Sequence, residues 1–80
     1  MASLKYTLGN NYVQISSGPA TIQKKTKGFG AVRIFFGTSA PTDDDNSFEL
    51  DSNIPHFYPT DDNIYVRTPH DIPVDIIVGT

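Results

Sequence analysis

The sequence predicts an all-β domain: an antiparallel β-sandwich of seven or eight short strands, with a small Greek-key barrel as the alternative. Three observations lead to this class. Short segments alternate apolar with polar residues, no stretch repeats with the helical period, and all six prolines lie at or near segment boundaries. A period of two buries one face of a strand, and proline at a boundary costs no central ladder hydrogen bond. With 80 residues, the chain is expected to form one domain over residues 1–80.

The alternating segments follow one another along the chain. They cover residues 4–8, 13–16, 20–23, 30–37, 48–51, 64–67 and 74–78, and a shorter apolar piece at 54–58 is broken by Pro55. Glycine, asparagine and proline separate them, as turns require. Residues 1–19 are also candidates for a pairing or attachment segment. In the later strands, apolar residues at alternate positions point to the same side of the strand, and we call this side the core parity. It predicts ten core residues: Val32, Ile34, Phe36, Phe48, Leu50, Ile64, Val66, Val74, Ile76 and Val78.

Two similar loops are expected to lead into strands. Residues 41–46 read Pro-Thr-Asp-Asp-Asp-Asn and residues 59–63 read Pro-Thr-Asp-Asp-Asn. Proline fixes φ, and Asp or Asn side chains bond to nearby backbone groups, so both segments favour a turn. The first loop is rich in carboxylates, but an EF-hand loop starting at Asp43 would need Gly at 48 and Glu at 54, where Phe48 and Ile54 stand. No metal site and no cofactor are therefore expected.

Charge is distributed unevenly along the chain. Residues 1–42 contain five basic residues and no acid, whereas residues 43–80 contain all nine acids and one base, Arg67. Such asymmetry suggests contacts directed at a partner or at another copy, and dispersal of the charges among interleaved strands is the alternative. No apolar run approaches the roughly 18 residues of a membrane span, and no signal-peptide core is present, so no membrane partner is expected.

Catalysis is not expected. The chain offers only His56 and His70 as near-neutral bases, and no nucleophile motif of the Gly-x-Ser-x-Gly type occurs. An 80-residue β domain also leaves little room for a closed pocket of roughly 300 Å³. The sequence therefore predicts that the protein is not an enzyme.

One segment resembles a nucleic-acid-binding strand. Residues 27–32 read Lys-Gly-Phe-Gly-Ala-Val, which is similar to the Lys-Gly-Phe-Gly-Phe-Ile strand of cold-shock domains. That resemblance implies contact with single-stranded nucleic acid through Lys27 and Phe29. Ala31 and Ile34 occupy positions where such a motif needs further aromatic rings for stacking on bases. The sequence pI near 4.9 also disfavours strong binding to phosphates, so nucleic-acid binding is kept as an alternative function. A third alternative is carbohydrate recognition by Tyr12, Tyr58 and Tyr65.

Apolar residues also occur at the outward parity of three strands. Phe35, Tyr65 and Ile77 alternate with the core positions, and Arg33 and Arg67 stand beside them. If the three strands are neighbours, these five residues form an exposed apolar patch rimmed by cations, which is typical of a protein interface. We call it the predicted interface patch.

Residues 20–80 resemble the small β-sandwich modules of tailed-bacteriophage virions. The resemblance rests on the run 31–42, the Phe-Glu-Leu strand at 48–50, the Ile-Tyr-Val-Arg strand at 64–67 and the Val-rich last strand. It implies a structural role without catalysis: a capsid decoration protein or another accessory head or tail protein. It also implies a virion protein assembled in the host cytoplasm, which contacts the major capsid or tail proteins as a symmetric oligomer, with a trimer favoured.

Overall fold

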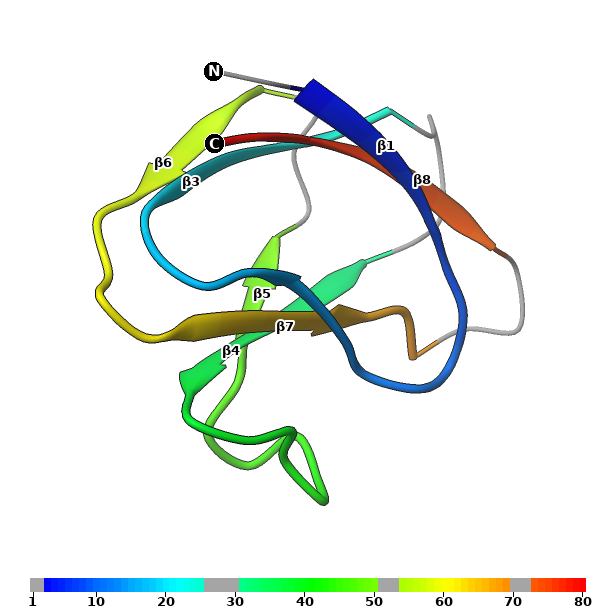
Figure 1. Cartoon of the computed structure of the whole chain (residues 1–80). Helices are drawn as coiled ribbons and strands as arrows, with labels where there is room; N and C mark the ends of the chain where they lie inside the picture. Colours follow the sequence, from blue (N-terminus) through cyan, green and yellow to red (C-terminus); the bar gives the residue numbers. More distant parts are fainter. Residues whose placement is uncertain (1–2, 26–30, 51–53, 70–72) are drawn as a thin grey trace.

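The chain folds into two β-sheets packed face to face (Figure 1). The computed structural model describes residues 3–25, 31–50, 54–69 and 73–80. These residues contain eight strands and no helix: β1 (Ser3–Leu8), β2 (Val13–Ser16), β3 (Ala20–Lys24), β4 (Val32–Gly37), β5 (Phe48–Leu50), β6 (His56–Tyr58), β7 (Asn63–Arg67) and β8 (Val74–Gly79). The predicted all-β sandwich is confirmed.

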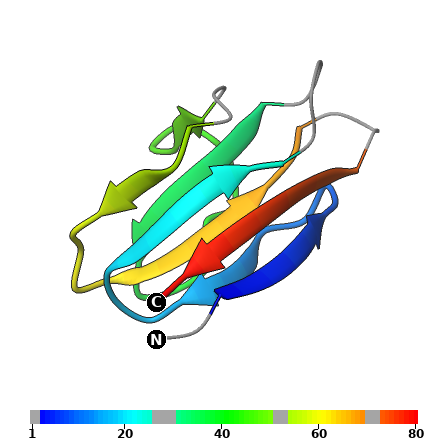
Figure 2. The same ribbon diagram turned by 90° about the horizontal axis from the view of Figure 1, so that it is seen from above.

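The strand order defines the topology. One sheet has the order β1-β8-β3-β6 and lies at the top of Figure 1; the other has the order β2-β7-β4-β5 and lies below it. We call them the upper and the lower sheet. All six ladders are antiparallel, and β1 pairs with β8, β2 with β7, β3 with β6 and β4 with β5. This is the connectivity of a jelly roll, in which a long hairpin is folded across two sheets (Figure 2).

The same topology explains the uneven charge. Every ladder joins a strand from β1–β4 to a strand from β5–β8, so the basic first half lies against the acidic second half. Lys5 Nζ lies 3.5 Å from the Asp75 carboxylate, and Arg33 Nη2 lies 3.6 Å from Glu49. Basic residues of the first half therefore form ion pairs with acidic residues on neighbouring strands of the same chain. This is the alternative in which the charges are dispersed among interleaved strands.

The core lies between the sheets and follows the predicted parity. Eight of the ten predicted core residues are buried: Val32, Ile34, Leu50, Ile64, Val66, Val74, Ile76 and Val78. Phe36 is half-buried and packs against them. The prediction for Phe48 is wrong, because its side chain is 59% exposed. Phe48 lies opposite Ile34 and so has the core parity, but β5 is the outermost strand of the lower sheet, where the core ends.

The first three strands contribute to the core as well. Leu8, Ile15, Ala20 and Ile22 are buried among the later strands. Residues 3–8 and 13–16 therefore form strands of the sandwich, with β1 on β8 and β2 on β7, and the register of β2 shifts between Gln14 and Ser16.

Both predicted loops precede strands and use local side-chain hydrogen bonds. The Asp45 amide donates to Asp43 Oδ1 at 3.1 Å, and the Asp62 amide donates to Thr60 Oγ1 at 3.1 Å. Each bond fixes the chain just ahead of β5 or β7, as short polar side chains do in turns. The loop from β4 to β5 is the longer one, and it extends below the lower sheet (Figure 1).

Candidate interaction surfaces

The predicted interface patch is divided between the two outer faces of the sandwich. On the lower sheet, Arg33 lies opposite Arg67 and Phe35 lies opposite Tyr65, so β4 and β7 are neighbours as required. Ile77 belongs to β8, which is in the upper sheet. The assumption that all three strands are neighbours is therefore wrong for β8, because a jelly roll sends β7 and β8 to different sheets.

The outer face of the lower sheet is covered by the loop between β4 and β5. Asp44 in this loop receives two hydrogen bonds from the Arg67 guanidinium, one from Nε at 3.0 Å and one from Nη2. The Tyr12 hydroxyl also donates to Asp44, and Arg67 Nη1 donates to the Asn10 carbonyl at 3.1 Å. The guanidinium lies 5.6 Å from the centre of the Tyr12 ring. We call Tyr12, Asp44 and Arg67 the loop clamp.

The electrostatics of the loop clamp favour its ionised form. Hydrogen bonds from Arg67 and then from Tyr12 lower the pKa of Asp44 from 3.8 to about 2. The Asp44 carboxylate in turn raises the pKa of Arg67. Burial, followed by the hydrogen bond to Asp44, raises the pKa of Tyr12. Near pH 7 the clamp therefore contains one carboxylate, one guanidinium and a neutral phenol.

The loop clamp leaves little of the predicted interface patch accessible on this side. Tyr65 is only 8% exposed although it points away from the core, and its ring centre lies 6.5 Å from that of half-buried Phe35. Arg33 and Arg67 each bind an acid of the same chain. The four residues thus make intramolecular contacts, and a polar hollow of about 290 Å³ next to the clamp is lined by both Asp44 and Arg67.

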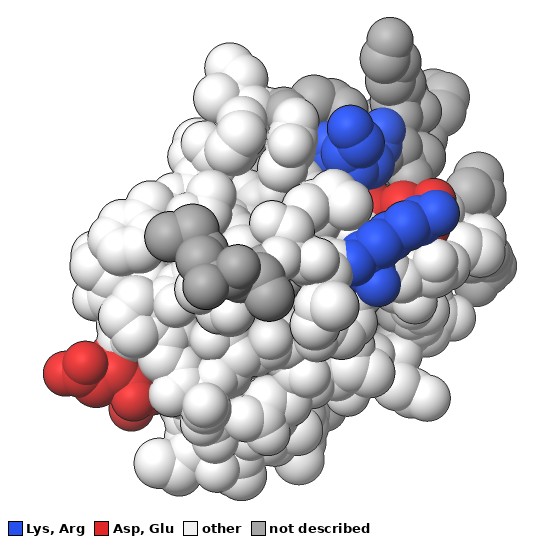
Figure 3. All heavy atoms as spheres, turned by 45° about the horizontal axis from the view of Figure 1, so that its top comes forward, with Lys and Arg blue, Asp and Glu red and all other residues white. Residues whose placement is uncertain are grey.

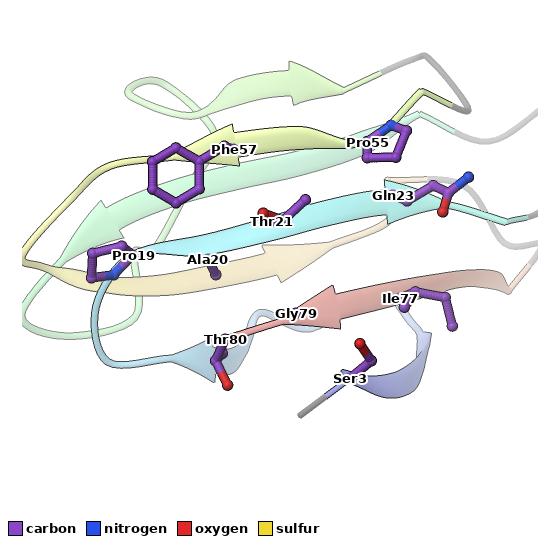
Figure 4. A pocket seen from close by; sticks show the side chains of 10 residues that line it. All are labelled: Ser3, Pro19, Ala20, Thr21, Gln23, Pro55, Phe57, Ile77, Gly79 and Thr80. Atoms are coloured by element: carbon purple, nitrogen blue, oxygen red, sulfur yellow. The ribbon is translucent and has the colours of Figure 1, made fainter. Parts of the chain in front are cut away.

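No loop of the described residues covers the outer face of the upper sheet. It contains a hollow of about 370 Å³ whose floor is the register row Ser3, Gly79 and Thr21, and the next residue in that row is Phe57. Pro19, Pro55 and Ile77 complete the apolar rim (Figure 4). None of the side chains lining this hollow is ionisable, and Phe57 is 62% exposed. We call this surface the upper face.

The charged side chains lie outside the hollow. In the view of Figure 3, which brings the top of Figure 1 forward, the charged atoms lie in two regions, one with basic and acidic atoms side by side and one with acidic atoms alone, and the described residues between the two regions are uncharged. On the same side of the upper sheet, Lys5 and Asp75 pair with each other, and Thr7 Oγ1 donates to Asp75 at 2.7 Å. The upper face is therefore close to neutral and exposes one large aromatic side chain.

Sequence reasoning missed Phe57. The segment 54–58 contains Pro55, which interrupts its alternation, so the outward parity of Phe57 is not evident from the sequence. Pairing of β6 with β3 places Phe57 opposite Thr21 on the outer side, with Tyr58 opposite buried Ala20 on the inner side. The alternation of β3 identifies Ala20 and Ile22 as inner residues and Thr21 as an outer residue. Phe57 could have been placed on the outer side only if the pairing of β6 with β3 had been known.

The residues of the two alternative functions lie elsewhere. Lys27 and Phe29 are outside the described residues. Of the three candidate tyrosines, Tyr65 is buried, Tyr12 is held in the loop clamp, and Tyr58 is half-buried with its ring centre 5.6 Å from Phe36. These tyrosines do not share an exposed face on which a sugar could stack.

Candidate catalytic and metal-binding groups are also dispersed. His56 is exposed on β6 with its ring centre 6.5 Å from Tyr58, and His70 lies outside the described residues. Within the described ranges, no group of three or more His, Asp or Glu side chains surrounds a common metal position. The part of the chain that the structure describes has no helix able to cross a membrane.

The fold and its surfaces define an all-β sandwich with jelly-roll connectivity, one outer face closed by its own loop and the other open. No protein-family model, no curated protein and no solved structure matches this chain.

Proposed function

We propose that the protein is a structural component of a tailed-bacteriophage virion, a capsid decoration or other accessory head or tail protein without catalytic activity. It would attach to major capsid or tail proteins as a symmetric oligomer assembled in the host cytoplasm. The observation that carries the proposal is the difference between the two outer faces. The lower one is occupied by the chain's own loop, whereas the upper face exposes Phe57 beside an uncharged hollow.

The strand order supports this class of function. Viral capsid domains, lectin domains and cupins share jelly-roll connectivity, and a fold alone does not select among them. The resemblance of residues 20–80 to phage virion modules favours the viral class. Exposed apolar side chains on a small sandwich are typical of a surface that associates with another protein.

The sheet edges offer a second means of attachment. β1 and β6 end the upper sheet, and β2 and β5 end the lower sheet, so each has an outer edge without a partner strand among the described residues. Leu4 on β1 and Val13 on β2 are 59% and 42% exposed. Such edges can pair with an extended segment of another chain.

The contact expected from the sequence between copies needs revision. Arg33 and Arg67 of the predicted interface patch both bind acids of their own chain. An intermolecular contact would have to break these pairs. The upper face makes no such demand, so we assign the contact between copies to it and attachment to the virion to the sheet edges.

The proposal is tested on gradient-purified particles of the virus that encodes the chain. We expect mass spectrometry to find the chain in stoichiometric amounts in particles, and immunogold labelling to place it at regular positions on the head or tail. A chain that stays in the soluble fraction of the lysate, and whose gene is not flanked by capsid or tail genes, would overturn the proposal.

A further inference from the structure

We propose that the upper face is a two-fold contact between two copies of this chain, in which Phe57 of each copy fills the hollow of the other. This inference deepens the proposed function, on which it rests, by naming the partner of the upper face. It also replaces the trimer expected from the sequence with a two-fold pair.

The hollow arises from one register row of the upper sheet. From β1 to β6 the row reads Ser3, Gly79, Thr21 and Phe57, three small residues followed by a large one. Gly79 stands two strand spacings from Phe57, which is about 10 Å. Among the described residues, a Cβ added at Gly79 would meet only Ser3 Oγ, at 3.8 Å, so none of them fills the space above this glycine. The row thus presents a projecting ring and a cavity side by side.

The lining of the hollow suits an aromatic ring. Its polar side chains carry hydroxyls and one amide, and its rim includes Pro19, Pro55 and Ile77 (Figure 4). Without an ionisable side chain in the lining, a charged ligand would lose hydration with no ion pair from a side chain to compensate. Phe57 is 62% exposed, and transfer of a phenyl ring from water into such a hollow is favourable.

Symmetry then decides the arrangement. The projecting ring and the hollow lie on the same face of the sheet, so two such faces can satisfy each other only by a two-fold rotation. A cyclic trimer instead joins two different surfaces of each copy. The two-fold axis would pass near Thr21, between Phe57 and Gly79, and it would bring both Phe57 rings into one apolar cluster.

The dimensions of the molecule are sufficient for a stable pair. The sandwich measures 30 × 29 × 16 Å, so one broad face covers at most about 870 Å², which reaches the roughly 800 Å² that each partner contributes to a standard interface. The charged neighbours Lys5 and Asp75 on this side neutralise each other. The broad face of the lower sheet cannot serve in the same way, because the β4–β5 loop lies on it.

The test is sedimentation of the full chain over a micromolar to millimolar range. We expect a mass of twice 8.8 kDa. Phe57→Ala should weaken the dimer by about tenfold or more, as expected for a central aromatic anchor. The matched control is Phe48→Ala, which removes an equally exposed phenylalanine (59%) from the edge of the other sheet and should leave the dimer intact. Gly79→Leu, which fills the hollow, should also give a monomer.

Complementation provides a second readout. Phe57→Ala retains the floor of the hollow, and Gly79→Leu retains the projecting ring, so a mixture of the two variants should form heterodimers more tightly than either variant dimerises alone. A variant that had merely lost its fold could not do this, and circular dichroism of each variant checks the sheet content.

Three outcomes would overturn the inference. These are a wild-type chain that stays monomeric at millimolar concentration, a trimer, and a dimer sensitive to Phe48→Ala but not to Phe57→Ala. None of them bears on whether the chain is found in virus particles, so failure of this inference is distinguishable from failure of the proposed function.

Discussion

Replacing Asp44 by Asn tests the physical role of the loop clamp. The substitution keeps the shape of the side chain and removes the charge that Arg67 and Tyr12 bind. The pKa of Asp44 falls from 3.8 to about 2 on folding, and one pKa unit corresponds to 1.36 kcal/mol, so full ionisation stabilises the fold by roughly 2 kcal/mol at most. The Asp44 side chain remains 27% exposed, and water screens the pair, so we expect a loss of about 1 kcal/mol.

The pH dependence follows from the direction of the shift. Because the pKa of Asp44 is lower in the folded chain than in the unfolded chain, its contribution is complete above about pH 4 and is lost as the pH falls toward 2. The difference in unfolding free energy between the wild type and Asp44→Asn should therefore be full at pH 7 and should shrink as the pH approaches 2.

Urea unfolding measures this difference. The chain has four tyrosines and no tryptophan, so tyrosine fluorescence reports the transition. With an m-value of about 1 kcal/mol per molar urea, Asp44→Asn should lower the midpoint by about 1 M at pH 7. The control is Asp45→Asn, which removes the same charge from an exposed position in the same loop. Equal midpoints for Asp44→Asn and the wild type at pH 7, or a difference that persists at pH 2, would refute the assigned role.

Three further predictions concern the core, the upper sheet and the acidic loop. Ile34→Ala removes a fully buried side chain and should cost about 2 to 5 kcal/mol in chemical unfolding, whereas Phe48→Ala, at an exposed edge, should cost under about 1 kcal/mol; similar losses would contradict the core assignment. Thr7→Val removes the hydrogen bond that most lowers the pKa of Asp75, so NMR titration should find that pKa closer to 3.8. Millimolar calcium should leave the melting temperature unchanged, because Asp44 is already bound by Arg67; a rise that Asp44→Asn abolishes would show that the loop binds the ion.

The local features of this chain could be predicted from its sequence. Alternation predicts every strand except β6 and the inward side of β4, β7 and β8, because successive side chains of a strand point to opposite faces. The loops before β5 and β7 are equally local, since an Asp or Thr side chain bonds to an amide two residues on. Each of these features depends on neighbours along the chain.

Features that depend on pairing between distant strands could not be predicted in this way. Parity places Ile77 and Phe35 on outward sides, but only the strand order puts them on opposite faces of the sandwich. Phe48 has the parity of the core and is exposed because β5 ends its sheet.

The position of the candidate surface was likewise decided by the tertiary structure. The sequence shows an acidic loop and an arginine, but only the fold brings Asp44 onto Arg67 and Tyr12, which closes the lower sheet and leaves Phe57 on the open one. Alternation records which side of a strand is buried and carries no information about which strands become neighbours. That choice is made by long-range pairing, and here it joins each strand of the first half of the chain to strands of the second half.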